Sequence, residues 1–176
     1  MDKGREPTFW DRLFHLDAHL SRRLEIRARF LRWLAMVLAH TGDAAVWLAG
    51  AGAAFFLSGS DFWRDLATRV IAAMTMGGVA STALKWTFRR TRPPGPSAGL
   101  YFVLDRHALP SGHATRVACI TMAVSPLLPG WGSALMGLWA ALVSLSRVAL
   151  QVHYLLDILV GMTLGGLIGL LVRQVL

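Results

Sequence analysis

Apolar residues gather along the chain in long runs that short polar or glycine- and proline-rich stretches separate. A helix needs about 20 residues to cross a bilayer, and the runs approach or reach that length. They predict six membrane helices, over residues 21–40, 44–58, 66–84, 112–128, 132–147 and 153–175. Several of the six are shorter than a usual span, so we expect tilted helices or local thinning of the bilayer.

The first 40 residues differ from the rest because charged and apolar positions alternate there. Residues 1–20 predict an amphipathic helix that lies in the membrane interface. Residues 21–40 carry several arginines, yet their apolar positions recur at helical spacing and form one face. We therefore divide the chain into an interfacial segment, residues 1–20, and a six-helix membrane domain, residues 21–176.

The last predicted helix contains three glycines, Gly161, Gly165 and Gly169, each four residues from the next. Small residues at this spacing lie on one face of a helix and allow a second helix to approach closely. We expect this face of the helix to be a packing surface.

Composition identifies the class of protein. Of the 176 residues, 55% are apolar and only 16% are charged, and the mean hydropathy is +0.49. A soluble domain carries about 25% charged residues, so an ordinary soluble enzyme is excluded. The sequence predicts an all-α integral membrane protein, a polytopic bundle of about six helices. Its net charge of +8 indicates contact with anionic lipid and not a nucleic-acid partner.

Basic residues also indicate orientation. Alternating crossings place residues 1–32 on one side of the membrane, and the segments 40–43, 85–111 and 147–153 on the other. The first side has more lysine and arginine, which favours the cytoplasm. The segments on the second side are then predicted to be extracytoplasmic, in a multi-pass protein of the inner or plasma membrane.

The predicted extracytoplasmic side collects groups that suit a phosphate. Lys85, Arg92 and Arg147 supply positive charge, and arginine can donate two parallel hydrogen bonds to phosphate oxygens. Ser111 and Gly112 begin a predicted helix, where free backbone N–H groups favour an anion. Together these five residues predict a phosphate-binding site.

Two histidines in the same region indicate how a phosphate could react. His153 and Asp157 are four residues apart, so on a helix they share a face. A carboxylate that accepts from one ring nitrogen leaves the other nitrogen free to attack phosphorus. His113 lies beside the phosphate-binding residues and is a candidate general acid for the leaving group.

These motifs resemble the signature of the type 2 phosphatidic acid phosphatases, also called lipid phosphate phosphatases. The matching residues are Lys85 to Arg92-Pro93, Pro110-Ser111-Gly112-His113, and Ser146-Arg147 to His153 and Asp157, all within residues 85–157. The resemblance implies a metal-independent phosphatase that needs no cofactor. It also implies His153 as nucleophile, Asp157 as its orienting partner and His113 as general acid, with the remaining five residues holding the phosphate.

Other polar residues are given structural interpretations. Arg89 and Arg90 are interpreted as membrane-interface anchors, and Asp43 as a helix cap. Arg116 lies one turn inside its helix and is either functional or a snorkelling residue, and His107 is a candidate headgroup contact. The few carboxylates near the motifs make a two-metal site unfavourable.

The leading function is hydrolysis of a lipid phosphate or diphosphate through a phosphohistidine. Among lipids, the extracytoplasmic placement favours undecaprenyl diphosphate or a similar polyprenyl phosphate. Phosphatidylglycerophosphate, phosphatidate and lipid A phosphate are alternatives. The same chemistry also suits a phosphotransferase that passes the phosphoryl group to a hydroxyl instead of water. A non-catalytic lipid-binding or transport protein is a third possibility, which the intact histidine pair disfavours.

Overall fold

The computed structural model describes residues 6, 8–94 and 105–176, and its named elements are all helices. In chain order they are α1 (Phe9–Arg23), α2 (Arg29–His40), α3 (Ala44–Leu57), α4 (Asp61–Phe88), α6 (Gly112–Val124), the short 3₁₀ helix η1 (Ser125–Leu127), α7 (Gly130–Ala149) and α8 (Leu155–Val175). The predicted all-α bundle is confirmed. Residues 95–104 of the predicted connector lie outside the described residues.

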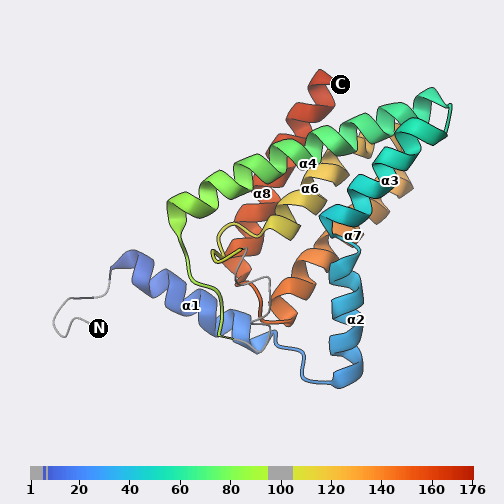
Figure 1. Cartoon of the computed structure of the whole chain (residues 1–176). Coiled ribbons are helices and arrows are strands. Elements are labelled where there is room, and N and C mark those ends of the chain that lie inside the picture. Colours follow the sequence, from blue (N-terminus) through green and yellow to red (C-terminus); the bar gives the residue numbers. More distant parts are fainter. Residues whose placement is uncertain (1–5, 7, 95–104) are drawn as a thin grey trace.

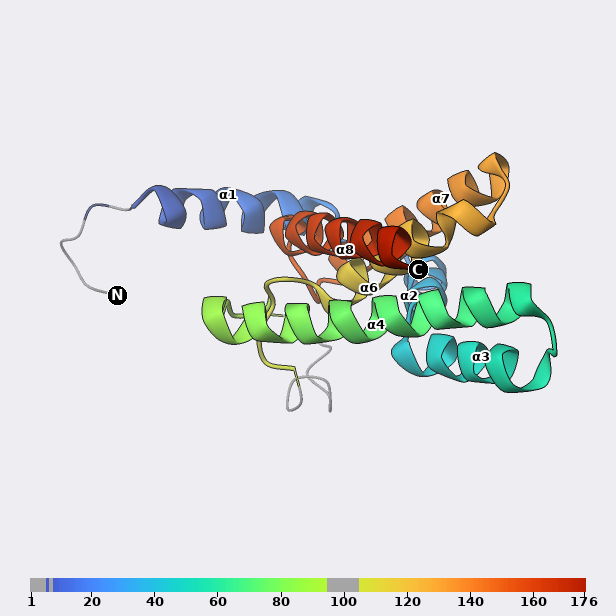
Figure 2. The ribbon, with the colours of Figure 1, turned by 90° about the horizontal axis from the view of Figure 1, so that it is seen from above.

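Helix α6 is the centre of the bundle. It packs against α4, α7 and α8, and Figure 2 shows it between α8 on one side and α4 on the other. Most of its side chains are buried, from Ala114 near its start to Val124 at its end. The first turn of α6 carries the Ser-Gly-His motif, so this central helix fixes the position of that motif.

Glycines allow α8 to lie almost directly on the backbone of α6. A Cβ atom added to Gly165 would come within 2.1 Å of the Thr115 carbonyl oxygen, and one added to Gly169 within 2.5 Å of the Cys119 carbonyl oxygen. At Gly161 the closest atom would be the Ser111 carbonyl oxygen, at 2.8 Å. The predicted close packing of this glycine face is therefore confirmed, and it fixes the helix that begins with the Ser-Gly-His motif against the helix that carries Asp157.

The lengths of the helices agree with a membrane protein. Helices α7 and α8 are long and apolar enough to cross a bilayer, and α2 and α3 together meet the same test as one span bent by 43°. Large apolar side chains are exposed on the outer surface, for example Phe56, Leu135 and Leu167. In a bundle surrounded by lipid, such side chains face acyl chains and carry no solvation penalty.

The segment predicted as one helix over 21–40 is divided. Helix α1 continues to Arg23, the backbone is irregular before α2 begins at Arg29, and α2 then forms one bent pair with α3. The two meet the length and hydropathy test only as a pair, joined by a short turn that changes direction by 43°. Such a pair is either one broken span or a re-entrant loop, in place of the two separate crossings predicted from the sequence.

Helix α1 lies at the same end of the bundle as the motifs. Its buried Asp17 and Ser21 accept hydrogen bonds from the backbone N–H groups of Leu156 and Leu155, at 3.0 and 2.9 Å. Figure 1 shows α1 where α8 begins and where the chain leaves α4. The expectation that residues 1–32 lie on the opposite side from the motifs is therefore wrong. It assumed that residues 21–40 and 44–58 are two separate crossings, whereas α2 and α3 form one bent pair.

Candidate active site

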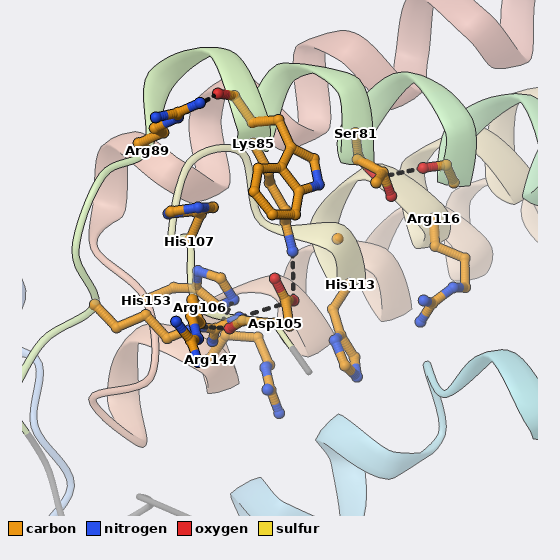
Figure 3. Close-up of a pocket in the computed structure, with 15 residues that line it drawn as sticks. Ser81, Lys85, Arg89, Asp105, Arg106, His107, His113, Arg116, Arg147 and His153 are labelled. Carbon is orange, nitrogen blue, oxygen red and sulfur yellow. Dashed lines mark hydrogen bonds and ion pairs between the residues drawn. The ribbon is translucent and has the colours of Figure 1, made fainter. Parts of the chain in front are cut away.

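A cavity of about 850 Å³ opens at the end of the bundle where α4 ends and α6 begins. Six of the eight predicted site residues line it: Lys85, Arg92, Gly112, His113, Arg147 and His153. Figure 3 shows His153 and Arg147 to one side of Asp105 and His113 to the other. Ser111 and Asp157 are fully buried behind this lining. The fold thus brings together motifs from four separate segments.

The start of α6 forms one wall of the cavity. Ser111 is the N-cap, and its hydroxyl oxygen accepts a hydrogen bond from the Ala114 N–H at 3.5 Å. Its own N–H donates to the Asp157 carbonyl oxygen at 2.9 Å, which ties α6 to α8. A Cβ atom on Gly112 would lie 3.6 Å from the Lys85 ammonium nitrogen. The ammonium group therefore lies close to the helix N-terminus, where an anion is favoured.

Lys85 and Arg92 converge on one carboxylate. Lys85 Nζ and Arg92 Nη2 both form ion pairs with Asp105 Oδ2, the latter at 2.8 Å. Arg92 Nε also donates to the Asp105 carbonyl oxygen at 2.9 Å. The two cations are thus held close enough to share one anionic oxygen. Sequence reasoning missed the role of Asp105, since a lone aspartate in a connector gives no signal.

His153 has a charged neighbour at each ring nitrogen, although Nδ1 has no hydrogen-bond partner among the described residues. Nε2 lies 3.3 Å from Arg92 Nη1, and Nδ1 lies 3.5 Å from Asp157 Oδ2. The residue precedes α8 instead of lying on its first turn, and its backbone N–H donates to the Arg147 carbonyl oxygen at 3.3 Å. Burial lowers the pKa of His153 well below its usual range, and the charges of Arg92, Arg147 and Lys85 lower this pKa further. The imidazole is therefore neutral near pH 7, as a nucleophile requires.

Asp157 is fully buried on the first turn of α8 and has several partners. Its Oδ2 accepts the Tyr154 N–H at 2.8 Å while it faces His153. Its Oδ1 accepts from Arg90 Nη1, also at 2.8 Å. Arg90 was interpreted as a membrane anchor, and this is wrong: its side chain is only 8% exposed and points to Asp157.

His113 lies across the cavity from His153 and has a different environment. Its Nε2 is 2.8 Å from Asp43 Oδ1, and Asp43 Oδ2 is 2.7 Å from His40 Nδ1. Asp43 occupies the N-cap position of α3 but makes no side-chain capping hydrogen bond. The predicted capping role is wrong, because the carboxylate instead joins two histidines.

Two residues left open by the sequence also line the cavity. Arg116 donates to the Gly42 carbonyl oxygen at 2.8 Å, and His107 packs edge-on against Trp86 with ring centroids 5.5 Å apart. Within residues 6, 8–94 and 105–176, no group of three histidine, cysteine or acidic side chains is arranged to hold a metal ion.

Comparison with known proteins agrees with this arrangement. Residues 66–176 match the PAP2 superfamily. A transmembrane PAP2-type phosphatidylglycerolphosphate phosphatase from Bacillus subtilis has a similar fold. It gives a TM-score of 0.76 at 23% identity, with 94% of this chain and 86% of that one covered. LpxE from Aquifex aeolicus gives a TM-score of 0.75 at 22% identity, with 90% and 95% covered.

The chain belongs to the PAP2 superfamily, since the match covers more than half of its length. The family resemblance that the three motifs indicated is therefore confirmed, and with it the prediction that the chain is an enzyme, a membrane phosphatase.

Proposed function

We propose that this protein hydrolyses the phosphate or diphosphate of a membrane lipid through a phosphohistidine formed on His153. One observation carries the proposal. A neutral, buried imidazole has one nitrogen beside a carboxylate and the other at the cavity wall next to Arg92. A histidine that bound the phosphate only through a positive charge would be protonated, and a buried site that keeps the imidazole neutral would not serve that role.

In the first step, Nε2 of His153 attacks phosphorus and the bond from phosphorus to the leaving oxygen breaks. Arg92 now donates toward Nε2, so on binding it would turn its N–H groups to the phosphate oxygens, together with Lys85 and Arg147. These fixed cations stabilise the charge on the equatorial oxygens of the transition state. Asp157 stabilises the positive charge that develops on the imidazole.

His113 completes the cycle from the other side of the cavity. As general acid it gives a proton to the leaving oxygen, and as general base it then takes one from the water that attacks phosphorus. The phosphorus–Nε2 bond breaks and inorganic phosphate is released. The hydrogen bond between His113 and Asp43 holds the ring at the cavity wall, beside the position that we propose for the leaving group.

The cavity, at about 850 Å³, has more room than a phosphate group alone requires. It therefore suits a substrate with a diphosphate or a phosphorylated headgroup, and the apolar outer surface suits acyl or prenyl chains that stay in the lipid. Undecaprenyl diphosphate or a similar polyprenyl phosphate is the favoured substrate, and phosphatidylglycerophosphate, phosphatidate and lipid A phosphate are its competitors.

Phosphate release by the detergent-purified protein, measured with excess EDTA, tests the proposal. We expect release from at least one of these four lipids, loss of release in His153→Ala, and unchanged release in His15→Ala, which alters an exposed histidine on α1. Release that requires a metal, or that survives in His153→Ala, contradicts the mechanism. Phosphate that appears on an added alcohol instead of in solution identifies a phosphotransferase.

The position of α1 changes the expected side of the membrane. At the end of the bundle that holds the site lie Arg12, Arg22, Arg23, Arg27, Arg29, Arg32, Lys85, Arg89, Arg90, Arg92, Arg106 and Arg147. Toward the opposite end, the described residues include Arg64, Arg69 and Arg173. This distribution favours a cytoplasmic site, in place of the extracytoplasmic site predicted from the sequence.

A cysteine-labelling experiment decides between the two sides. His19→Cys lies on exposed α1 at the site's end, and Ser58→Cys lies at the exposed turn between α3 and α4 at the opposite end. A cytoplasmic site predicts that a membrane-impermeant maleimide labels position 58 in right-side-out vesicles and position 19 in inside-out vesicles. The reverse pattern restores the extracytoplasmic site and with it the stronger case for a polyprenyl diphosphate.

A further inference from the structure

Arg90 lies between two residues of the first motif, Lys85 and Arg92, at a position that the motif leaves unspecified. It follows Arg89, whose left-handed backbone (φ 47°) ends α4 and redirects the chain. The Arg90 guanidinium is buried and joins two carboxylates: Nη1 to Asp157 Oδ1 at 2.8 Å, and Nη2 to Asp17 Oδ2 at 2.6 Å. Arg90 does not line the cavity.

Two aromatic rings fix the guanidinium plane. Its central carbon lies 4.5 Å from the ring centroid of Phe14, on α1, and 4.3 Å from that of Tyr154, which precedes α8. Stacked and bidentate contacts of this kind suit arginine and not lysine, since only a planar fork can make both. The residue is therefore held in one orientation by α1 and by the start of α8.

The orientation of Asp157 depends on this arginine. Asp157 Oδ2 faces His153 and also accepts the Tyr154 N–H. Its other oxygen, Oδ1, is held by Arg90. Without Arg90, a fully buried carboxylate would lose its compensating charge and could rotate away from His153.

Helix α1 supports the same group from outside. Asp17 uses Oδ2 for Arg90 and Oδ1 for the Leu156 N–H, while Ser21 accepts the Leu155 N–H. Two free N–H groups in the first turn of α8 are therefore satisfied by a different helix. The buried polar face of α1 thus ends at the turn that carries Asp157.

We propose that Arg90 is a positioning residue for the phosphatase reaction, and that Asp17 and Arg90 form a relay through which α1 holds Asp157 against His153. The relay rests on the proposed function for its effect on rate. Its effect on the His153 imidazole can be measured in the protein without substrate. A failure of the relay can therefore be distinguished from a failure of the proposed function.

The kinetic test compares Arg90→Leu, Arg90→Lys and Asp17→Asn with the control Arg23→Leu, which alters an exposed arginine on α1. A positioning role predicts that Arg90→Leu lowers kcat by about 100-fold, with KM within a few-fold of the wild-type value because Arg90 does not line the cavity. Arg90→Lys should recover only part of the loss. Asp17→Asn keeps an acceptor for the Leu156 N–H and removes the charge, so it should lower kcat less than Arg90→Leu.

The second readout is the tautomer of His153, measured by nitrogen NMR of histidine-labelled protein and assigned with His153→Ala. We expect the Nδ1–H form in the wild type and in Arg23→Leu, and a mixture of tautomers in Arg90→Leu. A folded Arg90→Leu protein with the wild-type tautomer and wild-type kcat overturns the relay. A changed tautomer in a protein that cleaves no lipid phosphate supports the relay and defeats the proposed function.

Discussion

The two histidines of the site are held in contrasting ways. The His153 side chain is 2% exposed, and the groups around it belong to a network that runs from α1 through Arg90 to Asp157. His113 has a side chain that is 12% exposed, and its carboxylate partner lies in the bend between α2 and α3. A nucleophile gains from one fixed geometry. A group that must reach first a leaving oxygen and then water gains from the somewhat greater exposure of His113.

The contrast extends to the helices beneath. On the nucleophile side, α8 lies against the backbone of α6 through Gly161, Gly165 and Gly169. On the acid side, the bend between α2 and α3 is also tightly packed, because a Cβ atom on Gly42 would lie 2.8 Å from Val143 Cγ1, whereas Gly50 and Gly52 of α3 have open space beside them. The close contact of α8 with α6 therefore sets where phosphorus is attacked, and on the acid side we expect substitutions to be tolerated at Gly50 and Gly52.

Gly165→Val should have the largest effect. Its Cβ would overlap the Thr115 carbonyl oxygen at 2.1 Å, so α8 must move away from α6 and carry Asp157 with it. We expect loss of folded protein and of activity, measured by size-exclusion chromatography and phosphate release. Gly166→Val is the matched control, because a Cβ there meets nothing within 4 Å. Equal behaviour of the two variants would contradict the packing.

Asp157→Asn and Asp43→Asn compare the two sides directly. Replacing the carboxylate that orients a catalytic histidine costs about 10⁴-fold in a well-studied triad, and we expect about 10³-fold or more in kcat for Asp157→Asn. For Asp43→Asn we expect kcat to fall by about 10-fold, which is only a part of the rate enhancement that general acid–base catalysis contributes. Similar losses in both variants would remove the proposed difference between the histidines.

Asp105→Asn should act in the opposite direction. The Asp105 carboxylate pairs with Lys85 and Arg92, so a phosphate group must compete with it for both cations. Removing its charge should strengthen inhibition by inorganic phosphate several-fold, since the partly exposed Asp105 carboxylate is screened by solvent. Inhibition that weakens would show that Asp105 helps to hold the cations in place.

The smallest change to measure is the titration of His153. Burial, and then the nearby cations, lower the pKa of His153, so its imidazole should gain a proton only well below the usual value of about 6.5. Protonation blocks attack, so His153 imposes no loss of activity until the pH falls through this lowered pKa. Nitrogen NMR of the free protein checks it. A midpoint at or above 6.5 would contradict the buried environment.

The motifs and the hydropathy pattern were sufficient to predict the bundle and which residues gather at the cavity. They were sufficient because the motif residues lie at helix ends. Successive helices run in opposite directions, so the positions of these ends in the sequence predict that they meet at the same end of the bundle. The pattern treated residues 21–40 and 44–58 as separate crossings, because hydropathy carries no information on the angle between consecutive helices, which is 43° here. It therefore placed α1 at the wrong end.

The supporting residues could not be predicted for a related reason. Arg90, Asp17, Asp43 and Asp105 are single charged residues with no periodic signal. Each acquires its partner from a segment distant in sequence, as with Asp17 and Asp157 across Arg90. Only the tertiary fold brings such pairs together, as the packing of α1 against α8 does for Asp17 and Asp157.

Trapping the phosphoryl-enzyme tests the central claim most directly. Protein mixed with a lipid phosphate labelled in its terminal phosphoryl group is quenched in alkali within milliseconds and digested, and the modified peptide is identified by mass spectrometry. The account predicts phosphoryl on His153, absent in His153→Ala and turned over at the rate of phosphate release. Phosphoryl on another residue, or release from the wild type with no labelled protein at any time, would contradict it.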